Sequence, residues 1–146
     1  MIKKISFRGM GVLLVCILML TSISTPVFAS EDWQTDFKLP KWTYILYVGG
    51  GVLQTTDSSG RHKVGGSVIL RDYNNVAELE ATVQRYNGDW YNTSHKWSSS
   101  GSSGAAVEEY IYLNRGTYRM RLVVKAYSPS GALLEETTLY TDETII

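Results

Sequence analysis

The chain has 146 residues, and its 14 lysines and arginines balance 14 aspartates and glutamates, so the formal charge is zero with both histidines neutral. This length suits one domain, and the balanced charge argues against a nucleic-acid partner, because phosphate-binding surfaces are strongly basic. The single cysteine, Cys16, excludes an internal disulfide and any zinc site that needs several thiolates.

The first 29 residues have the three-part pattern of a secretory signal peptide. Lys3, Lys4 and Arg8 give a positive start, residues 12–20 (VLLVCILML) form a short apolar core, and Ala29 is a small residue at the cleavage position. A transmembrane anchor is the alternative, but this apolar run is much shorter than the roughly 20 residues of a spanning helix. We predict cleavage after Ala29, secretion to the extracellular space, and no stable membrane insertion afterwards.

Cleavage would remove the only cysteine and three basic residues. The remaining 117 residues carry 11 basic and 14 acidic side chains, a net charge of −3, and no thiol for a disulfide, a metal site or a nucleophile. A mildly acidic exported chain is poorly suited to bind nucleic acid or anionic lipid. We expect residues 30–41 to form a polar lead and residues 42–146 a single domain.

The domain begins with two predicted strands. Residues 42–48 (WTYILYV) are rich in β-forming residues, and Gly49-Gly50-Gly51 is predicted to end that strand. Residues 61–72 predict the second strand. One face of this second strand would carry Val64, Gly66, Val68 and Leu70.

The clearest strand is predicted over residues 76–86, where apolar and polar side chains alternate as on a half-buried strand. The same residue types also favour a helix, but a period of two fits the pattern better than one of about 3.6. Asn87-Gly88 then predicts a hairpin with a two-residue turn, in which both residues accept a positive φ.

The return strand of this hairpin is predicted over residues 89–97. Residues 98–105 (SSSGSSGA) have the composition of a flexible loop. Ser128-Pro129-Ser130-Gly131 predicts a four-residue turn. Three further strands are predicted over residues 106–113, 117–127 and 132–140. About seven short strands without a convincing helix or repeat predict an all-β fold, an antiparallel immunoglobulin-like β-sandwich.

The spacing of Leu113, Gly116 and Tyr118 indicates a tyrosine corner. In Greek-key sandwiches, such a tyrosine begins the strand after a crossover between sheets, packs its ring in the core and bonds its hydroxyl to upstream backbone. The glycine allows the tight arch before it. A plain core tyrosine is the alternative, and under either interpretation Tyr118 is structural.

Three stretches also carry a family resemblance: WTYI at 42–45, ATVQRYNGDWYNTSHKW at 81–97 and LNRGTYRMRLVVKAYSPSGALLEETT at 113–138. Together they resemble a family of small secreted proteins of Gram-positive-type bacteria, a domain of unknown function. The last strands are also similar to the general immunoglobulin-like or fibronectin-like pattern. The resemblance implies a fold but supplies no catalytic residue.

No residue pattern points to catalysis. His62 and His95 stand at strand positions that look exposed, outside any zinc-binding spacing, so we expect both to be solvated. Glu78 and Glu80 share a strand face about 7 Å apart, as paired glycosidase carboxylates can, but a solvated face predicts the same pair. We therefore predict a protein that is not an enzyme and needs neither metal nor cofactor.

The aromatic residues of the hairpin are the remaining candidates for function. Tyr86, Trp90, Tyr91 and Trp97 lie close together, and alternation sends Tyr91 and Trp97 to one face and Trp90 to the other. One tryptophan would pack in the core and another ring could serve an exposed stacking surface, although structural packing alone also explains all four. We predict a secreted binding module for an extracellular cell-wall glycan or surface protein; the alternative is a small antimicrobial or toxin-like polypeptide.

Overall fold

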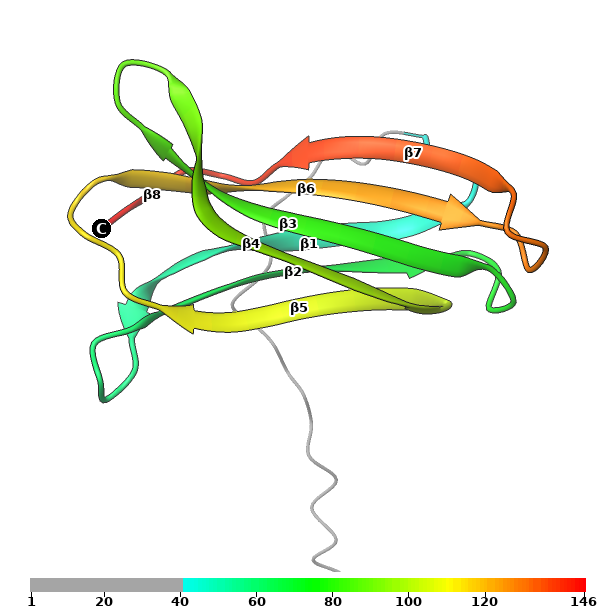
Figure 1. Ribbon diagram of the computed structural model, residues 1–146, viewed down its shortest axis with the longest axis horizontal. Coiled ribbons are helices and arrows are strands. Elements are labelled where there is room, and N and C mark those ends of the chain that lie inside the picture. The colour runs from blue at the N-terminus through cyan, green and yellow to red at the C-terminus, as the bar shows by residue number, and fades with distance from the viewer. Residues whose placement is uncertain (1–40) are drawn as a thin grey trace, which may run out of the picture. The chain divides into compact units, whose positions relative to one another are not determined.

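The computed structural model describes residues 41–146; the predicted signal peptide and the polar lead up to Pro40 lie outside the described residues. Between residues 41 and 146 the chain forms eight β-strands (Figure 1). This part of the chain contains no helix that could cross a membrane. The strands are β1 (Ile45–Thr56), β2 (His62–Leu70), β3 (Val76–Tyr86), β4 (Trp90–Ser102), β5 (Gly104–Ile111), β6 (Thr117–Tyr127), β7 (Leu133–Tyr140) and β8 (Thr144–Ile145).

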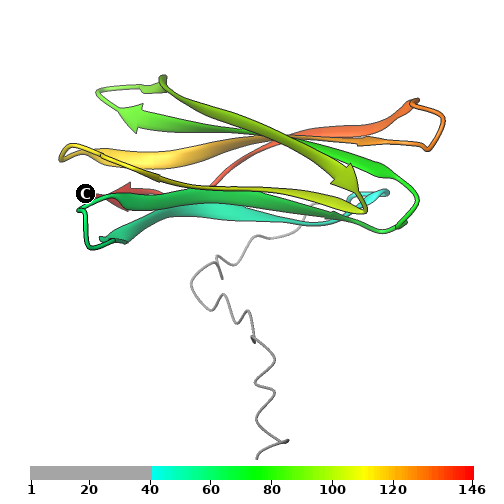
Figure 2. The same cartoon turned by 60° about the horizontal axis from the view of Figure 1, so that its bottom comes forward.

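The strands form two antiparallel sheets that pack face to face (Figure 2). The first sheet has the order β1-β2-β5, and the second has the order β4-β3-β6-β7, with β8 also paired to β6. The chain crosses from one sheet to the other between β2 and β3, between β4 and β5, and between β5 and β6. The predicted all-β sandwich is therefore confirmed.

Alternation along the central strands creates the core. In β3 and β6, every second residue is fully or almost fully buried, and the register places Leu79 opposite Val124 and Val83 opposite Met120. Residues of the first sheet, such as Val64 and Val68, close the core from the other side. The predicted strands 76–86 and 117–127 are confirmed to the residue. The buried hydrophobic members of β3 and β6 are Ala77, Leu79, Ala81, Val83, Tyr118, Met120, Leu122, Val124 and Ala126.

The sequence predicted that the glycine run would end β1, but the strand continues through it. Gly49, Gly50 and Gly51 lie inside the strand and pair with residues of β2. A Cβ added at Gly50 would collide with the backbone of Gly65 and lie 2.7 Å from Cα of Gly66. These glycines therefore serve a close approach of two strands, which composition alone cannot distinguish from a turn.

The serine-rich segment 98–105 is not the predicted flexible loop. Ser98–Ser102 continue β4 and pair with β3, while Gly104 opens β5 and pairs with Ile69 of β2. Only Ser103 lies between the strands; its positive φ of 61° turns the chain from one sheet to the other. Ladder hydrogen bonds on both sides order a sequence whose composition favours disorder.

The hairpin after β3 has a longer turn than predicted. Tyr86 pairs with Trp90, so the loop contains three residues, Asn87, Gly88 and Asp89, of which only Gly88 has a positive φ. The carboxylate of Asp89 accepts a hydrogen bond from the backbone N–H of Trp90 at 2.7 Å. The hairpin itself is confirmed, whereas the two-residue turn is wrong.

The end of the chain adds a strand that the sequence pattern missed. The strand pairing stops after β7 for residues 141–143, and β8 resumes it opposite Thr117 and Tyr118. Ile146 and Gly116 then exchange two backbone hydrogen bonds of 2.9 and 3.0 Å. Two residues are too short a stretch to show an alternating pattern.

Candidate binding surface

The four hairpin aromatics divide between the two faces of the second sheet. Tyr86 and Trp90 pair on the outer face, whereas Trp97, opposite the buried Ala81, packs against the core. Tyr91 lies opposite Arg85, on the same side of the sheet as Trp97, and its side chain is 44% exposed. The predicted alternation is confirmed, but the four rings do not form one surface.

A bulge in β4 preserves this alternation. Thr82 pairs with Lys96 and Gln84 with Asn92, so three residues of β4 oppose one of β3. The Thr93 hydroxyl donates to the carbonyl oxygen of Val83 at 2.9 Å and thereby fixes the bulge. The bulge inserts two extra residues into β4. Because side chains alternate with a period of two, the residues before and after the bulge still point to the faces that simple alternation predicts.

On the outer face, Arg119 of β6 contacts a ring from β4 and a ring from β7. Its guanidinium carbon lies 4.1 Å from the centroid of Trp90 and 4.3 Å from that of Tyr140. Trp90 in turn contacts Tyr86, with ring centroids 5.4 Å apart and tilted by 55°. We call these four residues, which come from β3, β4, β6 and β7, the aromatic–arginine ladder.

Two amide side chains hold the ladder in place. Arg119 donates from Nε to Oε1 of Gln84 at 2.8 Å, and Gln84 donates from Nε2 to Oδ1 of Asn92 at 2.9 Å. Gln84 is buried, so both ends of its amide are satisfied by these neighbours. Among residues 41–146, no hydrogen bond or ion pair occupies the terminal Nη1 and Nη2 atoms of Arg119.

The outer members of the ladder face solvent. Tyr86 is 48% exposed and Tyr140 is 47% exposed, although each ring contacts a neighbour in the ladder. Rings with a polar tip suit surfaces that stack on a ligand and hydrogen-bond at its edge. The ladder therefore combines exposed aromatic area with a preorganised cation, which is suited to binding rather than to bond breaking.

Sequence reasoning found Tyr86 and Trp90 but missed Arg119 and Tyr140. Arg119 lies opposite Gln84 in the β3–β6 pairing, and Tyr140 lies opposite Arg121 in the β6–β7 pairing. Nothing in the local sequence of β6 or β7 shows that these side chains meet. Only the cross-strand register brings them together.

The two glutamates on the same face are held by neighbours. Glu80 makes ion pairs with Lys96 at 2.8 Å and with Arg121 at 3.6 Å. Desolvation and a hydrogen bond to Glu78 raise the pKa of the Tyr127 hydroxyl above its usual value. Glu78 and Glu80 thus have structural partners on the outer face of the sheet.

Both histidine side chains are less exposed than the sequence predicted. His62 is 7% exposed, and its Nδ1 lies 3.2 Å from the carbonyl oxygen of Leu53. It starts β2 with its side chain inward, opposite Ile111, so the prediction of a solvated ring was wrong. His95 is half-buried and stacks on Trp97 with a centroid distance of 6.0 Å.

The tyrosine corner has the predicted geometry. Tyr118 is 3% exposed at the start of β6, after the crossover from β5, and its hydroxyl donates to the Asn114 carbonyl oxygen at 3.0 Å. Leu113 packs against the core. A Cβ at Gly116 would lie 3.0 Å from Nε of Arg85, whose guanidinium lies 5.7 Å from the Tyr118 ring centroid. The corner leaves no free group for ligand binding.

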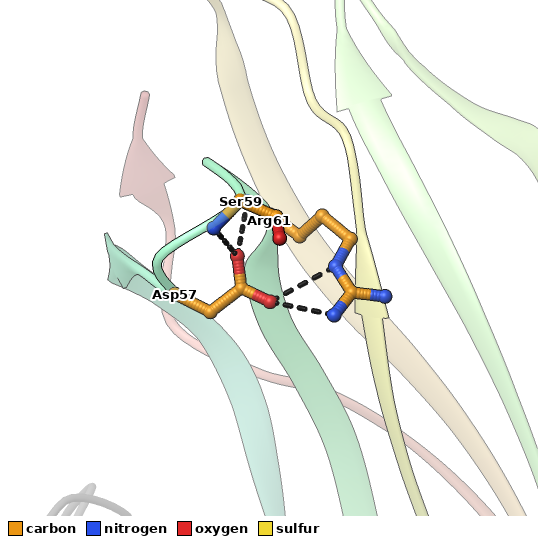
Figure 3. Close-up of polar contacts among 3 residues, drawn as sticks. All are labelled: Asp57, Ser59 and Arg61. Atoms are coloured by element: carbon orange, nitrogen blue, oxygen red, sulfur yellow. Dashed lines mark hydrogen bonds and ion pairs between the residues drawn. The ribbon is translucent and has the colours of Figure 1, made fainter.

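The Asp57 carboxylate in the β1–β2 loop has four donor atoms within hydrogen-bond or ion-pair distance (Figure 3). It accepts from the backbone N–H groups of Ser59 and Arg61 and from the Arg61 guanidinium, at 2.8 to 2.9 Å. The hydrogen bond from the Arg61 backbone, foremost among these contacts, holds the pKa of Asp57 below its usual value. All donors come from the same loop, so this is a turn-stabilising arrangement.

Among the side chains of residues 41–146, no group of three or more histidines, aspartates or glutamates is arranged to hold a metal ion. No protein-family model matches the chain, and no curated protein or solved structure matches it either.

Proposed function

We propose that this protein is a secreted, non-enzymatic β-sandwich that acts by binding, with a cell-wall glycan or a surface protein as its target. The binding surface would be the aromatic–arginine ladder on the outer face of the second sheet. Export rests on the pattern of residues 1–29, and the bacterial cell wall as the setting rests on the resemblance to small secreted Gram-positive-type proteins.

One observation carries the proposal: a solvent-facing stack of three rings and one guanidinium. Tyr86 and Tyr140 each leave nearly half of their surface exposed, while Gln84 fixes the position of Arg119 between Trp90 and Tyr140. A rigid aromatic surface loses little side-chain entropy on binding, because its rotamers are already restricted. Such a surface is typical of recognition sites.

The strand order supports a finer description of the fold. If the first seven strands are lettered A, B, C, C′, E, F and G, the sheets read A-B-E and C′-C-F-G. Immunoglobulin-like sandwiches group A, B and E in one sheet and C, F and G in the other, with a tyrosine corner at the start of F. We propose on this basis that the domain is immunoglobulin-like, a fold that often serves as a binding scaffold.

The test is co-sedimentation of the exported protein with purified cell-wall material. We expect the wild-type protein to bind and Tyr140→Ala to lose most of this binding while keeping its urea unfolding midpoint. Tyr112→Ala is the matched control, because Tyr112 is 68% exposed and lies outside the ladder. Loss of binding in both variants, or in neither, would contradict a site at the ladder.

The antimicrobial or toxin-like alternative predicts a different result. Under that alternative, purified protein inhibits the growth of neighbouring species, and ladder variants that lose wall binding need not lose the inhibition. A surface-protein target is distinguished by treating the wall material with protease before sedimentation, because only a protein target is then removed.

A further inference from the structure

We infer that the ligand of the ladder is an acidic polysaccharide built from uronic acids. The sugar ring would stack on the exposed tyrosines, and its carboxylate would bind the free terminal nitrogens of Arg119. This inference rests on the proposed function, because it names the ligand class of the same surface.

The first step is the state of the Arg119 guanidinium. Its faces are covered by Trp90 and Tyr140 and its Nε donates to Gln84, so the group is held on three sides. Its terminal nitrogens have no partner among residues 41–146. A guanidinium presents its remaining donors in a fixed fork, whose geometry matches the two oxygens of a carboxylate.

The second step is the charge around this fork. On the outer face of the same sheet, the carboxylate of Glu80 makes ion pairs with Lys96 and Arg121 and not with Arg119. Arg119 therefore adds a cation whose charge no described carboxylate balances through an ion pair. An anionic ligand complements this part of the surface even though the predicted mature chain is acidic.

The third step is the distance between the cation and the exposed rings. The guanidinium carbon of Arg119 lies 4.3 Å from the centroid of the Tyr140 ring. A ligand that contacts both must therefore carry an anionic group directly beside an apolar face that can stack on the ring. A uronic acid does so, because its carboxylate is attached to the pyranose ring itself. A poly(glycerol phosphate) chain offers the anion without a ring to stack on Tyr86 or Tyr140.

The experiment is isothermal titration of the exported protein with oligogalacturonate and, separately, with the same oligomer fully methyl-esterified. The two ligands share their sugar rings and differ at the carboxyl groups, which are charged in the acid and neutral methyl esters in the other oligomer. We expect the acid to bind about tenfold or more tightly than the ester, as a charge-assisted fork implies. Added salt should weaken binding of the acid and leave binding of the ester nearly unchanged.

Two variants locate this preference. Arg119→Lys keeps the charge but loses the planar fork, and we expect it to reduce the preference for the acid without removing it. Arg121→Lys is the matched control on the same strand and face, since Arg121 is paired with Glu80, and it should keep the preference. The urea midpoint of each variant shows that it is folded, and the comparison of acid with ester needs no variant at all.

Each other outcome overturns the inference in a recognisable way. Equal affinity for acid and ester would reject uronate recognition, while wall binding that depends on Tyr140 would still support the proposed function. Tight binding of poly(glycerol phosphate) that Arg119→Lys abolishes would assign the fork to phosphate instead. Binding of neither polymer, together with no loss of wall binding in Tyr140→Ala, would reject both the inference and the proposed function.

Discussion

At the scale of single residues, a few side chains fix the backbone where the strand ladders end. Tyr118 bonds the Asn114 carbonyl across the arch between β5 and β6, and Asp57 collects the donors of the β1–β2 loop. Both side chains satisfy backbone groups that turns leave without ladder partners. Their roles are therefore conformational, and each predicts a measurable loss of stability.

Replacing Tyr118 with phenylalanine keeps the buried ring but removes the hydrogen bond to Asn114. Because the bond is only partly buried and Asn114 is exposed, we expect a loss of about 1 kcal/mol in the free energy of unfolding. Urea denaturation measures this value. Tyr112→Phe is the control, since Tyr112 is 68% exposed. A loss below a few tenths of a kcal/mol would mean that the hydroxyl bond contributes no net stability.

The lowered pKa of Asp57 predicts a pH dependence. A carboxyl group with a lower pKa in the folded than in the unfolded state stabilises the fold above its unfolded pKa, which is near 3.8, and this contribution is lost as the pH falls through the folded value. Asp57→Asn should therefore be less stable than the wild type at about pH 5 to 7, and the difference should shrink as the pH falls below 3.8. Urea midpoints measured across this range check the sign. A difference that grows in acid would show that the carboxylate is not stabilised by its loop.

At the scale of strands, glycines allow the backbone to approach other strands closely. Gly104 opens β5 where the chain leaves Ser103, and a Cβ there would lie 2.6 Å from the carbonyl oxygen of Val68. Gly101, near the end of β4, is crowded in the same way by the carbonyl oxygen of Gly104. The two edge strands can thus meet at their turn only because these positions have no side chain.

Gly104→Ala should therefore destabilise the protein, although alanine normally stabilises a strand relative to glycine. The contact is with backbone, which moves only by shifting the β2–β5 pairing, so we expect a loss of about 1 to 3 kcal/mol. Ser102→Ala, two residues earlier and exposed, is the control and should change little. Thermal unfolding of both variants compares them. A stabilised Gly104→Ala protein would mean that the segment is as mobile as its composition suggests.

The sequence predicted those elements whose pattern is local. Alternation identified β3 and β6, and the spacing around Tyr118 identified the corner, because neighbouring residues carry both signals. The glycine run of β1 and the serine segment were mistaken for chain breaks, because their order comes from pairing with distant strands. Arg119 was missed for the same reason: its ring partners lie on other strands, and no local pattern encodes the register.

At the scale of the described domain, the two sheets are joined along both sides of the sandwich. On one side, β4 and β5 are joined by the single residue Ser103. On the other side, two side chains connect β1 of the first sheet with the second sheet. The Thr144 hydroxyl of β8 donates to the Val52 carbonyl oxygen at 2.8 Å. The Glu135 carboxylate of β7 accepts hydrogen bonds from backbone N–H groups at the start of β1. Edge strands with open backbone groups invite pairing with other chains, so these contacts also protect the β1 edge.

Glu135 makes more hydrogen bonds to β1 and the residues before it than Thr144 does, so substituting it tests whether side chains hold the two sheets together on this side. Its carboxylate accepts hydrogen bonds from the backbone N–H groups of Thr43, Tyr44 and Ile45 at 3.1, 2.8 and 3.1 Å, about ninety residues earlier in the chain. An amide offers one acceptor oxygen instead of two and loses the charge, so Glu135→Gln should cost about 1 to 2 kcal/mol, a moderate value because the side chain is half exposed.

Glu136→Gln is the matched control for this variant, because Glu136 is the next residue of β7, is exposed, and lies opposite Lys125 on the outer face. Urea unfolding gives the global effect, and hydrogen exchange of the amides of residues 43–45 gives the local one. We expect faster exchange at these three amides in Glu135→Gln alone, because they lose their charged acceptor while the rest of β1 keeps its pairing with β2. Equal exchange in the two variants would mean that β1 is held by β2 without the carboxylate, and that the sheets need no side-chain bond on this side.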